Sequence, residues 1–215
     1  MSKPLSLVVL ISGHGSNLQS IIDSIEQGRV NAEIKAVISN NAEAYGLLRA
    51  SKHGIASYVV NHRDFGNRED FDHQLQRILA PLGADFILLA GFMRILGSAT
   101  VQAYTDKILN IHPSLLPAYK GLHTYRRALD SGEVEHGVSI HLVTAELDDG
   151  PVIMQARYPI ASGDKIEDLQ QKGHKLEHRM YPQLLCWLGE GKIEISGGQI
   201  FYDKTLLSKP VEFGH

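Results

Sequence analysis

The stretch LSLVVLISGHGSNLQSII, residues 5–22, decides the fold of this chain. It begins with an apolar run, Leu5 to Ser12, that is typical of a strand buried on both faces of a sheet. Gly13 and Gly15 then interrupt the run, and apolar residues recur at helical spacing until Gly28 supplies a stop. A strand, a glycine turn and a helix in this order predict the first unit of an α/β sheet.

The rest of the first half repeats this alternation. Apolar runs predict further strands at residues 32–39, 55–60, 84–92 and 107–112, and helical spacing predicts helices at residues 44–52, 68–79 and 101–104. Alternating strands and helices favour a parallel sheet with right-handed crossovers.

The second half has a different pattern. Two consecutive strands are expected at residues 137–144 and 151–160, and the short connection between them favours an antiparallel pair. Asp164 and Glu167 then form a capping pattern that predicts a long helix to about Leu188.

Two further features complete the second half. Pro182 lies inside the long helix and is expected to kink it. The last segment predicts a small hairpin around Gly197-Gly198. The whole pattern predicts a Rossmann-like open α/β sheet, mostly parallel with an antiparallel C-terminal part and helices on both faces. Since no repeat or linker interrupts it, we expect one domain over residues 1–215.

The composition narrows the function classes. The chain has 215 residues, is 43% hydrophobic and carries a formal charge of −3 without a basic stripe, which argues against a nucleic-acid or membrane-surface protein. A small anionic ligand is still compatible with this charge. The single cysteine, Cys186, cannot form an internal disulfide and fits a reducing compartment. The first apolar run is too short to span a bilayer, so we expect a cytoplasmic protein.

The glycine loop, residues 13–17, has the features of an anion site. The first N–H groups of a helix lack partners within the helix, and the helix dipole favours a negative charge there. Ser16 and Asn17 can donate to a phosphate oxygen or cap the helix. The loop matches neither the dinucleotide fingerprint nor a Walker A motif, which favours a terminal phosphate. A tight turn with a helix cap explains the same residues equally well.

A polar pair lies at the end of the strand expected at residues 107–112. Asn110 and His112 are two residues apart, so their side chains point to the same side, and Pro113 ends the strand. Asn can donate to a developing oxyanion, and His can donate or transfer a proton. A structural histidine with an ordinary hydrogen bond is the alternative for His112 taken alone.

An acid that orients the imidazole is expected in the turn at residues 145–150. Asp148 and Asp149 lie there, and a carboxylate near His112 would raise the pKa of the imidazole and order a proton-carrying water. Ordinary turn chemistry explains two acids in a turn as well. Although the chain has 11 histidines, it has no Cys pair and no His-Glu-x-x-His motif, so we expect no catalytic metal.

Four segments carry a resemblance to a known family: ISGHGSNLQSII, LAGFMRIL, LNIHPSLLPAYKGLHTYRRAL and GVSIHLVTAELDDGPVIMQ. They resemble the folate-dependent phosphoribosylglycinamide formyltransferases of purine synthesis, in their free-standing bacterial form, over nearly the whole chain. The Asn-x-His-Pro-Ser block is common to all folate-dependent formyl transferases and to formyltetrahydrofolate deformylase. It therefore indicates the chemistry, whereas the glycine loop indicates a phosphorylated acceptor.

The resemblance implies roles for particular residues. The catalytic residues would be Asn110, His112 and Asp148. Phosphoribosylglycinamide would contact Gly15, Ser16, Asn17, Arg68, Met93 and Glu177. The co-substrate 10-formyltetrahydrofolate would contact Arg94, Ile95, Leu96, Asn110, Ala145, Glu146, Leu147 and Asp148, flanked by a mobile loop at residues 120–123.

The resemblance also sets expectations about partners. Only small-molecule substrates are expected, with no nucleic acid and no membrane, in a monomer or weak homodimer. His14 departs from the family, which often has Asn there, and it would make phosphate affinity mildly pH-dependent if it were protonated. His174 lies at a position whose identity varies in the family.

Other activities compete with formyl transfer to a ribonucleotide. A deformylase would use water as the acceptor, but relatives with that activity carry an N-terminal regulatory domain, for which a strand starting at Leu5 leaves no room. Transferases that act on initiator tRNA or an amino sugar nucleotide carry extra domains and a different first loop. A phosphate-binding module without catalysis would leave Asn110, His112 and Asp148 unexplained together.

Overall fold

The computed structural model describes residues 3–214. Its main sheet has eight strands in the order β11-β7-β6-β5-β4-β1-β2-β3. Their bounds are β1 Leu5–Ile11, β2 Ala32–Ser39, β3 Ser57–Val59, β4 Phe86–Leu89, β5 Ile108–His112, β6 Glu135–Leu142, β7 Val152–Pro159 and β11 Val211–Glu212. A separate small sheet contains β8 Ile193–Ser196, β9 Gln199–Tyr202 and β10 Thr205–Leu206.

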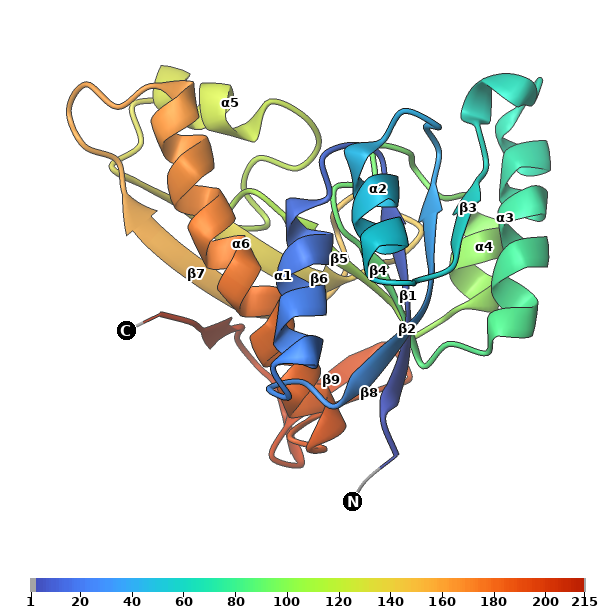
Figure 1. Cartoon of the computed structure of the whole chain (residues 1–215). Helices are drawn as coiled ribbons and strands as arrows, with labels where there is room; N and C mark the ends of the chain where they lie inside the picture. The colour runs from blue at the N-terminus through green and yellow to red at the C-terminus, as the bar shows by residue number, and fades with distance from the viewer. Residues whose placement is uncertain (1–2, 215) are drawn as a thin grey trace.

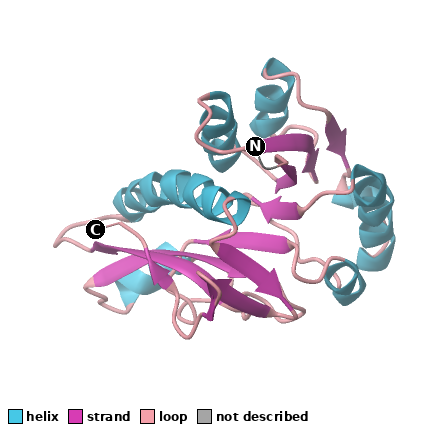
Figure 2. Cartoon of the chain, turned by 90° about the horizontal axis from the view of Figure 1, so that it is seen from below, coloured by secondary structure: helices cyan, strands magenta, loops and turns pink. Residues whose placement is uncertain are grey.

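The helices connect these strands. They are α1 Ser16–Glu26, α2 Tyr45–Lys52, α3 Arg68–Leu82, α4 Ser98–Ala103, α5 Thr124–Asp130 and α6 Ile166–Gly189, with a short 3-10 turn, η1, at His62–Asp64. In Figure 1, α1 and α6 lie side by side in front of the sheet, while α3 and α4 lie to the right. Figure 2 shows the same helices from below, with strands between them.

The sheet has a parallel part and a part with antiparallel pairs, and the short β11 at its edge is parallel to β7. Strands β3, β2, β1, β4 and β5 pair in parallel, whereas β6 runs antiparallel to both β5 and β7. This arrangement confirms the predicted fold class. The predicted antiparallel pair at 137–144 and 151–160 corresponds to β6 and β7.

Alternating side chains of β1 supply two cores. Leu7, Val9 and Ile11 face the core shared with α1 and α6. Val8 and Leu10 face the core shared with α3. The strand is therefore buried on both faces, which is why its sequence is apolar throughout rather than alternating.

Several boundaries differ from the prediction. Helix α5 was not predicted, and neither were β10 and β11. The long helix has its N-cap at Lys165, and its third residue, Asp168, accepts a hydrogen bond from the Lys165 backbone N–H, so the predicted cap of Asp164 and Glu167 is displaced by one residue. The helix runs without a break from Ile166 to Gly189, with Pro182 buried inside it.

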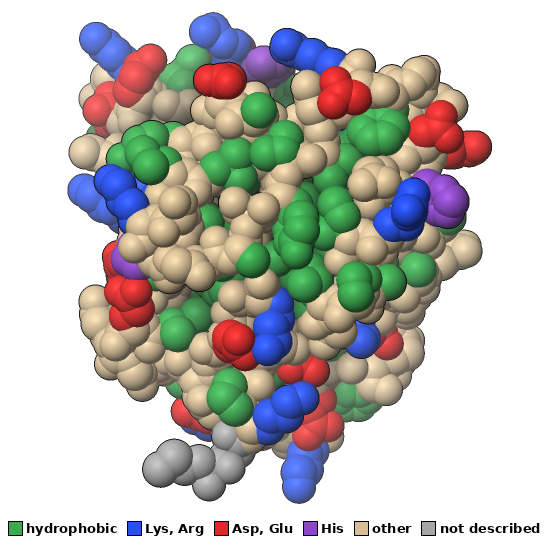
Figure 3. Space-filling view, turned by 45° about the vertical axis from the view of Figure 1, so that its right-hand side comes forward, with side chains coloured by type: hydrophobic (Ala, Val, Ile, Leu, Met, Phe, Trp, Pro, Cys, Tyr) green, Lys and Arg blue, Asp and Glu red, His purple; other side chains and the backbone are tan. Residues whose placement is uncertain are grey.

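The surface carries mixed charge. On the face drawn in Figure 3, hydrophobic side chains gather near the centre, and acidic and basic side chains alternate around them. Within residues 3–214, no helix is both long and apolar enough to cross a membrane.

Candidate active site

A cavity of about 530 Å³ lies where β4 and β5 end. The loop after β4 forms one wall, the end of β5 forms the floor, and the loop after β6 forms another wall. Residues from these three segments include Met93, Arg94, Ile95, Leu96, Asn110, His112, Ala145, Glu146, Leu147 and Asp148. The predicted co-substrate residues therefore line one cavity together.

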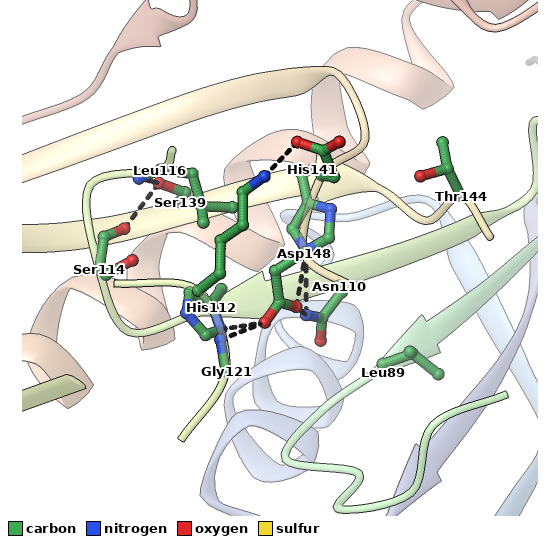
Figure 4. Close-up of polar contacts among 12 residues, drawn as sticks. Leu89, Asn110, His112, Ser114, Leu116, Gly121, Ser139, His141, Thr144 and Asp148 are labelled. Atoms are coloured by element: carbon green, nitrogen blue, oxygen red, sulfur yellow. Dashed lines mark hydrogen bonds and ion pairs between the residues drawn. The ribbon is translucent and has the colours of Figure 1, made fainter. Parts of the chain in front are cut away.

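Asn110, His112 and Asp148 meet in this cavity. Because side chains alternate along β5, Asn110 and His112 lie on one side of the strand, and the buried side chain of Ile111 packs into a hydrophobic core. Asp148 Oδ1 lies 3.4 Å from Asn110 Nδ2, and Asp148 Oδ2 lies 3.5 Å from His112 Nδ1. Figure 4 shows the Asp148 carboxylate between the other two side chains.

Backbone groups from the loop at residues 119–123 hold this arrangement. The backbone N–H of Gly121 donates to Asp148 Oδ2 at 2.9 Å, and His112 Nε2 donates to the carbonyl of Tyr119 at 2.9 Å. Asp148 itself has a φ of 48°. An Asp in the left-handed region is uncommon and strained, and such strain is frequent at functional sites.

The structure corrects the expected charge state of His112. Burial lowers the pKa of the imidazole more than the Tyr119 carbonyl and Asp148 raise it, so the net shift is downward. The sequence led us to expect a carboxylate that keeps His112 charged. Because burial dominates, the ring is neutral near pH 7, with its hydrogen on Nε2 and a lone pair on Nδ1 facing Asp148.

For Asp148, by contrast, the surrounding polar groups outweigh the effect of burial on the pKa. Burial pushes the pKa of its carboxyl upward, but interactions with His141 and His112 and the N–H of Gly121 together hold it below its usual value. The neighbouring Asp149 points away and pairs with Lys120. The two acids of this turn therefore differ in role, and only Asp148 faces the cavity.

The sequence reasoning missed His141. This buried side chain lies on β6 directly opposite Asn110, and its Nε2 is 3.0 Å from Asn110 Nδ2. The signal that could have found it was the strand pairing: in the sequence His141 and Asn110 are far apart, and only the antiparallel register places them side by side. No group of three or more potential metal ligands occurs within residues 3–214.

The glycine loop leads into a helix N-terminus that no side chain caps. Helix α1 begins at Ser16, its N-cap Gly15 has a φ of 71°, and no side chain caps the first turn. The first N–H groups are therefore left for a ligand or water. Asn17 differs from expectation, because its Nδ2 donates to Glu177 Oε2 at 2.8 Å instead of capping the helix.

Glu177 is buried beside this loop on α6. Burial raises the pKa of its carboxyl, while the hydrogen bond from Asn17 opposes that shift. Ser12 links the loop to the cavity, because its Oγ accepts from the Met93 backbone N–H at 2.7 Å. The glycine loop and the cavity are thus neighbouring regions.

Two residues predicted to contact the acceptor, Arg68 and Met93, lie apart from the glycine loop and line the cavity. Arg68, at the first position of α3, lines the cavity with the co-substrate residues, whereas Gly15, Ser16 and Asn17 are not among the cavity-lining residues. This placement favours a contact of Arg68 with the co-substrate. The exposed His14 ring stacks on Tyr45, with ring centroids 5.3 Å apart.

The chain matches the Formyl transferase family model over residues 5–185. It is 45% identical over 199 residues to a phosphoribosylglycinamide formyltransferase of Escherichia coli, covering 93% of this chain and 94% of that protein. Its structure is similar to that of a phosphoribosylglycinamide formyltransferase from Coxiella burnetii, with a TM-score of 0.93, 48% identity, and 98% and 100% of the two chains covered. A formyltetrahydrofolate deformylase from Pseudomonas syringae is also similar, with a TM-score of 0.85 and 25% identity, and the match covers 93% of this chain and 66% of that one.

The family model covers β1, the glycine loop and the segments that contribute Asn110, His112 and Asp148. This chain therefore belongs to the formyl transferase family.

Proposed function

We propose that this protein transfers the formyl group of 10-formyltetrahydrofolate to the amino group of 5-phosphoribosylglycinamide, in one domain of 215 residues. The observation that carries the proposal is the convergence of Asn110, His112 and Asp148 on one cavity that adjoins an uncapped helix N-terminus. The similar proteins of Escherichia coli and Coxiella burnetii bear the name of this activity.

The cavity suits a flat, partly apolar co-substrate. Ile95, Leu96 and Leu147 offer apolar surface, and the backbone of the loops at 91–96 and 145–148 offers hydrogen-bonding groups. Arg68 and Arg94 add positive charge at the same cavity, which fits an anionic tail. The acceptor phosphate would bind the N–H groups at the start of α1 and the Ser16 hydroxyl, with Glu177 near the ribose.

The mechanism starts from a neutral His112. The acceptor amine attacks the formyl carbon, a new N–C bond forms, and the carbonyl oxygen becomes an oxyanion. Asn110 Nδ2 donates to that oxyanion. His112 Nδ1 accepts the proton that the amine loses, directly or through a water.

Asp148 supports the next step. Once His112 Nδ1 carries a proton, it faces the Asp148 carboxylate at 3.5 Å and the resulting ion pair is stabilised in a buried setting. The oxyanion then collapses, the bond from carbon to the folate nitrogen breaks, and the proton passes to that nitrogen. The products are the N-formyl ribonucleotide and tetrahydrofolate.

We further propose a cytoplasmic location and small-molecule partners only, as expected from the sequence. A monomer or weak homodimer stays a prediction.

An assay with purified protein and 10-formyltetrahydrofolate tests the proposal. Tetrahydrofolate release that requires phosphoribosylglycinamide is the expected result, with formate release below a few per cent of turnover. Release of formate without acceptor would contradict the proposal and favour the hydrolase, whose fold this chain also shares. Binding of the ribonucleotide without turnover would instead favour a binding module.

A further inference from the structure

His141 is a buried histidine that the mechanism above does not use. It lies on β6, and the antiparallel register places it directly opposite Asn110 on β5. Side chains opposite each other in such a pair lie on the same face of the sheet. Only 2% of the His141 surface is exposed, so its ring nitrogens must find partners inside the protein.

Both ring nitrogens have partners, and the partners fix the tautomer. His141 Nδ1 lies 3.0 Å from the carbonyl oxygen of Leu142. A carbonyl oxygen only accepts, so Nδ1 carries a hydrogen. In the neutral ring the lone pair is then on Nε2, which accepts from Asn110 Nδ2 at 3.0 Å.

This contact, the shorter of the two that Asn110 Nδ2 makes, favours the orientation of the Asn110 carboxamide in which the nitrogen faces Asp148. If the carboxamide were rotated by half a turn, its oxygen would face the Nε2 lone pair and be repelled. With the nitrogen held there, one Nδ2 hydrogen goes to His141 and the second points toward Asp148 Oδ1, at the longer distance of 3.4 Å. Figure 4 shows the carboxamide oxygen turned away from both partners.

We infer that His141 is a positioning residue: its Nε2 lone pair orients the Asn110 carboxamide so that the second Nδ2 hydrogen, which in this structure makes only the long contact to Asp148 Oδ1, can be donated to the oxyanion. This inference rests on the proposed function. A protonated ring would not do the same, because a hydrogen on Nε2 would face the Nδ2 hydrogens of Asn110. It would instead turn to Asp148 Oδ1, which lies 3.6 Å away.

Two substitutions at this position separate orientation from packing. His141→Asn keeps a donor near the Leu142 carbonyl but has no atom at the place of Nε2. His141→Gln places its side-chain oxygen at the place of Nε2, where it can accept from Asn110. We expect His141→Asn to lower kcat by about 10- to 100-fold, with both KM values within about twofold of wild type. We expect His141→Gln to recover most of kcat.

A double-mutant cycle with Asn110→Ala identifies the partner through which His141 acts. If His141 acts by orienting Asn110, His141→Asn has little further effect on kcat once Asn110 is Ala. An undiminished effect in that background would overturn the inference, because it would place the action of His141 on Asp148 or on general packing. Equal kcat for wild type and His141→Asn would overturn it too.

Nuclear magnetic resonance of the wild-type protein provides a test without substitutions. Long-range ¹H–¹⁵N spectra should report a hydrogen on His141 Nδ1 and none on Nε2 at pH 7.5. A hydrogen on Nε2 would overturn the inference even if the Asn variant failed to fold. These outcomes differ from failure of the proposed function, in which wild type itself would show no acceptor-dependent turnover.

Discussion

The glycine loop and the Asn110–His112–Asp148 cluster are neighbouring regions built in different ways. The loop comes from one continuous segment in the parallel part of the sheet, and its free groups are backbone N–H groups at the start of α1. The cluster lies where the antiparallel part begins, and its members come from β5 and from the loop after β6. Its working groups are side chains, each oriented by a different partner.

This difference separates binding from chemistry. Backbone N–H groups at a helix start attract a phosphate and position the rest of the molecule, an effect that is largely the same for ground state and transition state. An amide, an imidazole and a carboxylate around the reacting carbon act on charge that develops only in the transition state. Changes in the loop should therefore affect KM, and changes in the cluster should affect kcat.

The largest effect is expected from His112→Ala. Removing the base should lower kcat by about 100- to 1,000-fold, or about 3–4 kcal/mol in the barrier. The acceptor KM should change little, because the loop is untouched. Steady-state kinetics of the purified variant, with its melting temperature as a folding control, measure this. A loss confined to KM would erase the distinction between the two regions.

The next largest effect is expected from Gly15→Ala. Gly15 has a φ of 71°, and an added Cβ would lie 2.8 Å from Gly46 Cα, which is backbone and cannot move aside cheaply. We expect a loss of about 1–3 kcal/mol in the free energy of unfolding and a raised acceptor KM. Urea unfolding and kinetics measure the two quantities.

Gly28→Ala is the matched control for that experiment. Gly28 has a similar φ of 70°, but nothing lies within 4 Å of an added Cβ. It should cost about 1 kcal/mol and leave the acceptor KM unchanged. If both variants behaved alike, close packing of the loop would not be what shapes the phosphate site.

The pH dependence of stability distinguishes the regions more finely. Burial lowers the pKa of His112, so between the folded pKa and about 6.5 the unfolded chain binds more protons. The contribution of neutral His112 to stability is complete above about pH 6.5 and is lost as the pH falls toward the folded pKa. When the pH is lowered from 7.5 to 5.5, the free energy of unfolding measured in urea should therefore fall more for wild type than for His112→Gln. The free energy of unfolding of Ser16→Ala should depend on pH in the same way as that of wild type. If wild type instead lost less stability than His112→Gln on acidification, the pKa of His112 would be raised and not lowered.

The smallest effect is expected at the edge of the cluster. Lys120 pairs with Asp149, and the side chains are 35% and 53% exposed. Exposed ion pairs contribute about 0–1 kcal/mol, so Lys120→Ala should change the free energy of unfolding by less than about 1 kcal/mol and leave kcat unchanged within about threefold. A loss of kcat comparable to that of His112→Ala would mean that the loop at 119–123 is part of the chemistry.

Much of the fold could be predicted because it follows from local patterns. Buried strands appear in the sequence as apolar runs, and the glycine turn after β1 predicts where the first strand ends and the first helix begins. The unpredicted helix α5 has no comparable signal in the sequence. It is only seven residues long, and its N-cap residue, His123, has a φ of 59° and makes no side-chain capping hydrogen bond. The first turn of α6 contains two acidic residues, Glu167 and Asp168, either of which could complete a capping box. The sequence pattern favoured Glu167, but it is Asp168 that accepts the hydrogen bond from the backbone N–H of the N-cap residue.

The site was predictable where two residues share a strand and not where strands must pair. The period of two along β5 was enough to place Asn110 beside His112. The contact of Asn110 with His141 depends on the β5–β6 register, which no local pattern specifies. The charge of His112 was mispredicted for a related reason, because the depth of burial is a property of the whole packed cavity.

The split between KM and kcat in one pair of variants tests the central claim most directly. Ser16→Ala should raise the acceptor KM by about tenfold or more while kcat stays within about threefold of wild type. Asn110→Ala should lower kcat by about 100- to 1,000-fold with little change in the acceptor KM. The reverse pattern, a loss of kcat for Ser16→Ala and of acceptor binding alone for Asn110→Ala, would contradict the separation of binding loop and chemical cluster.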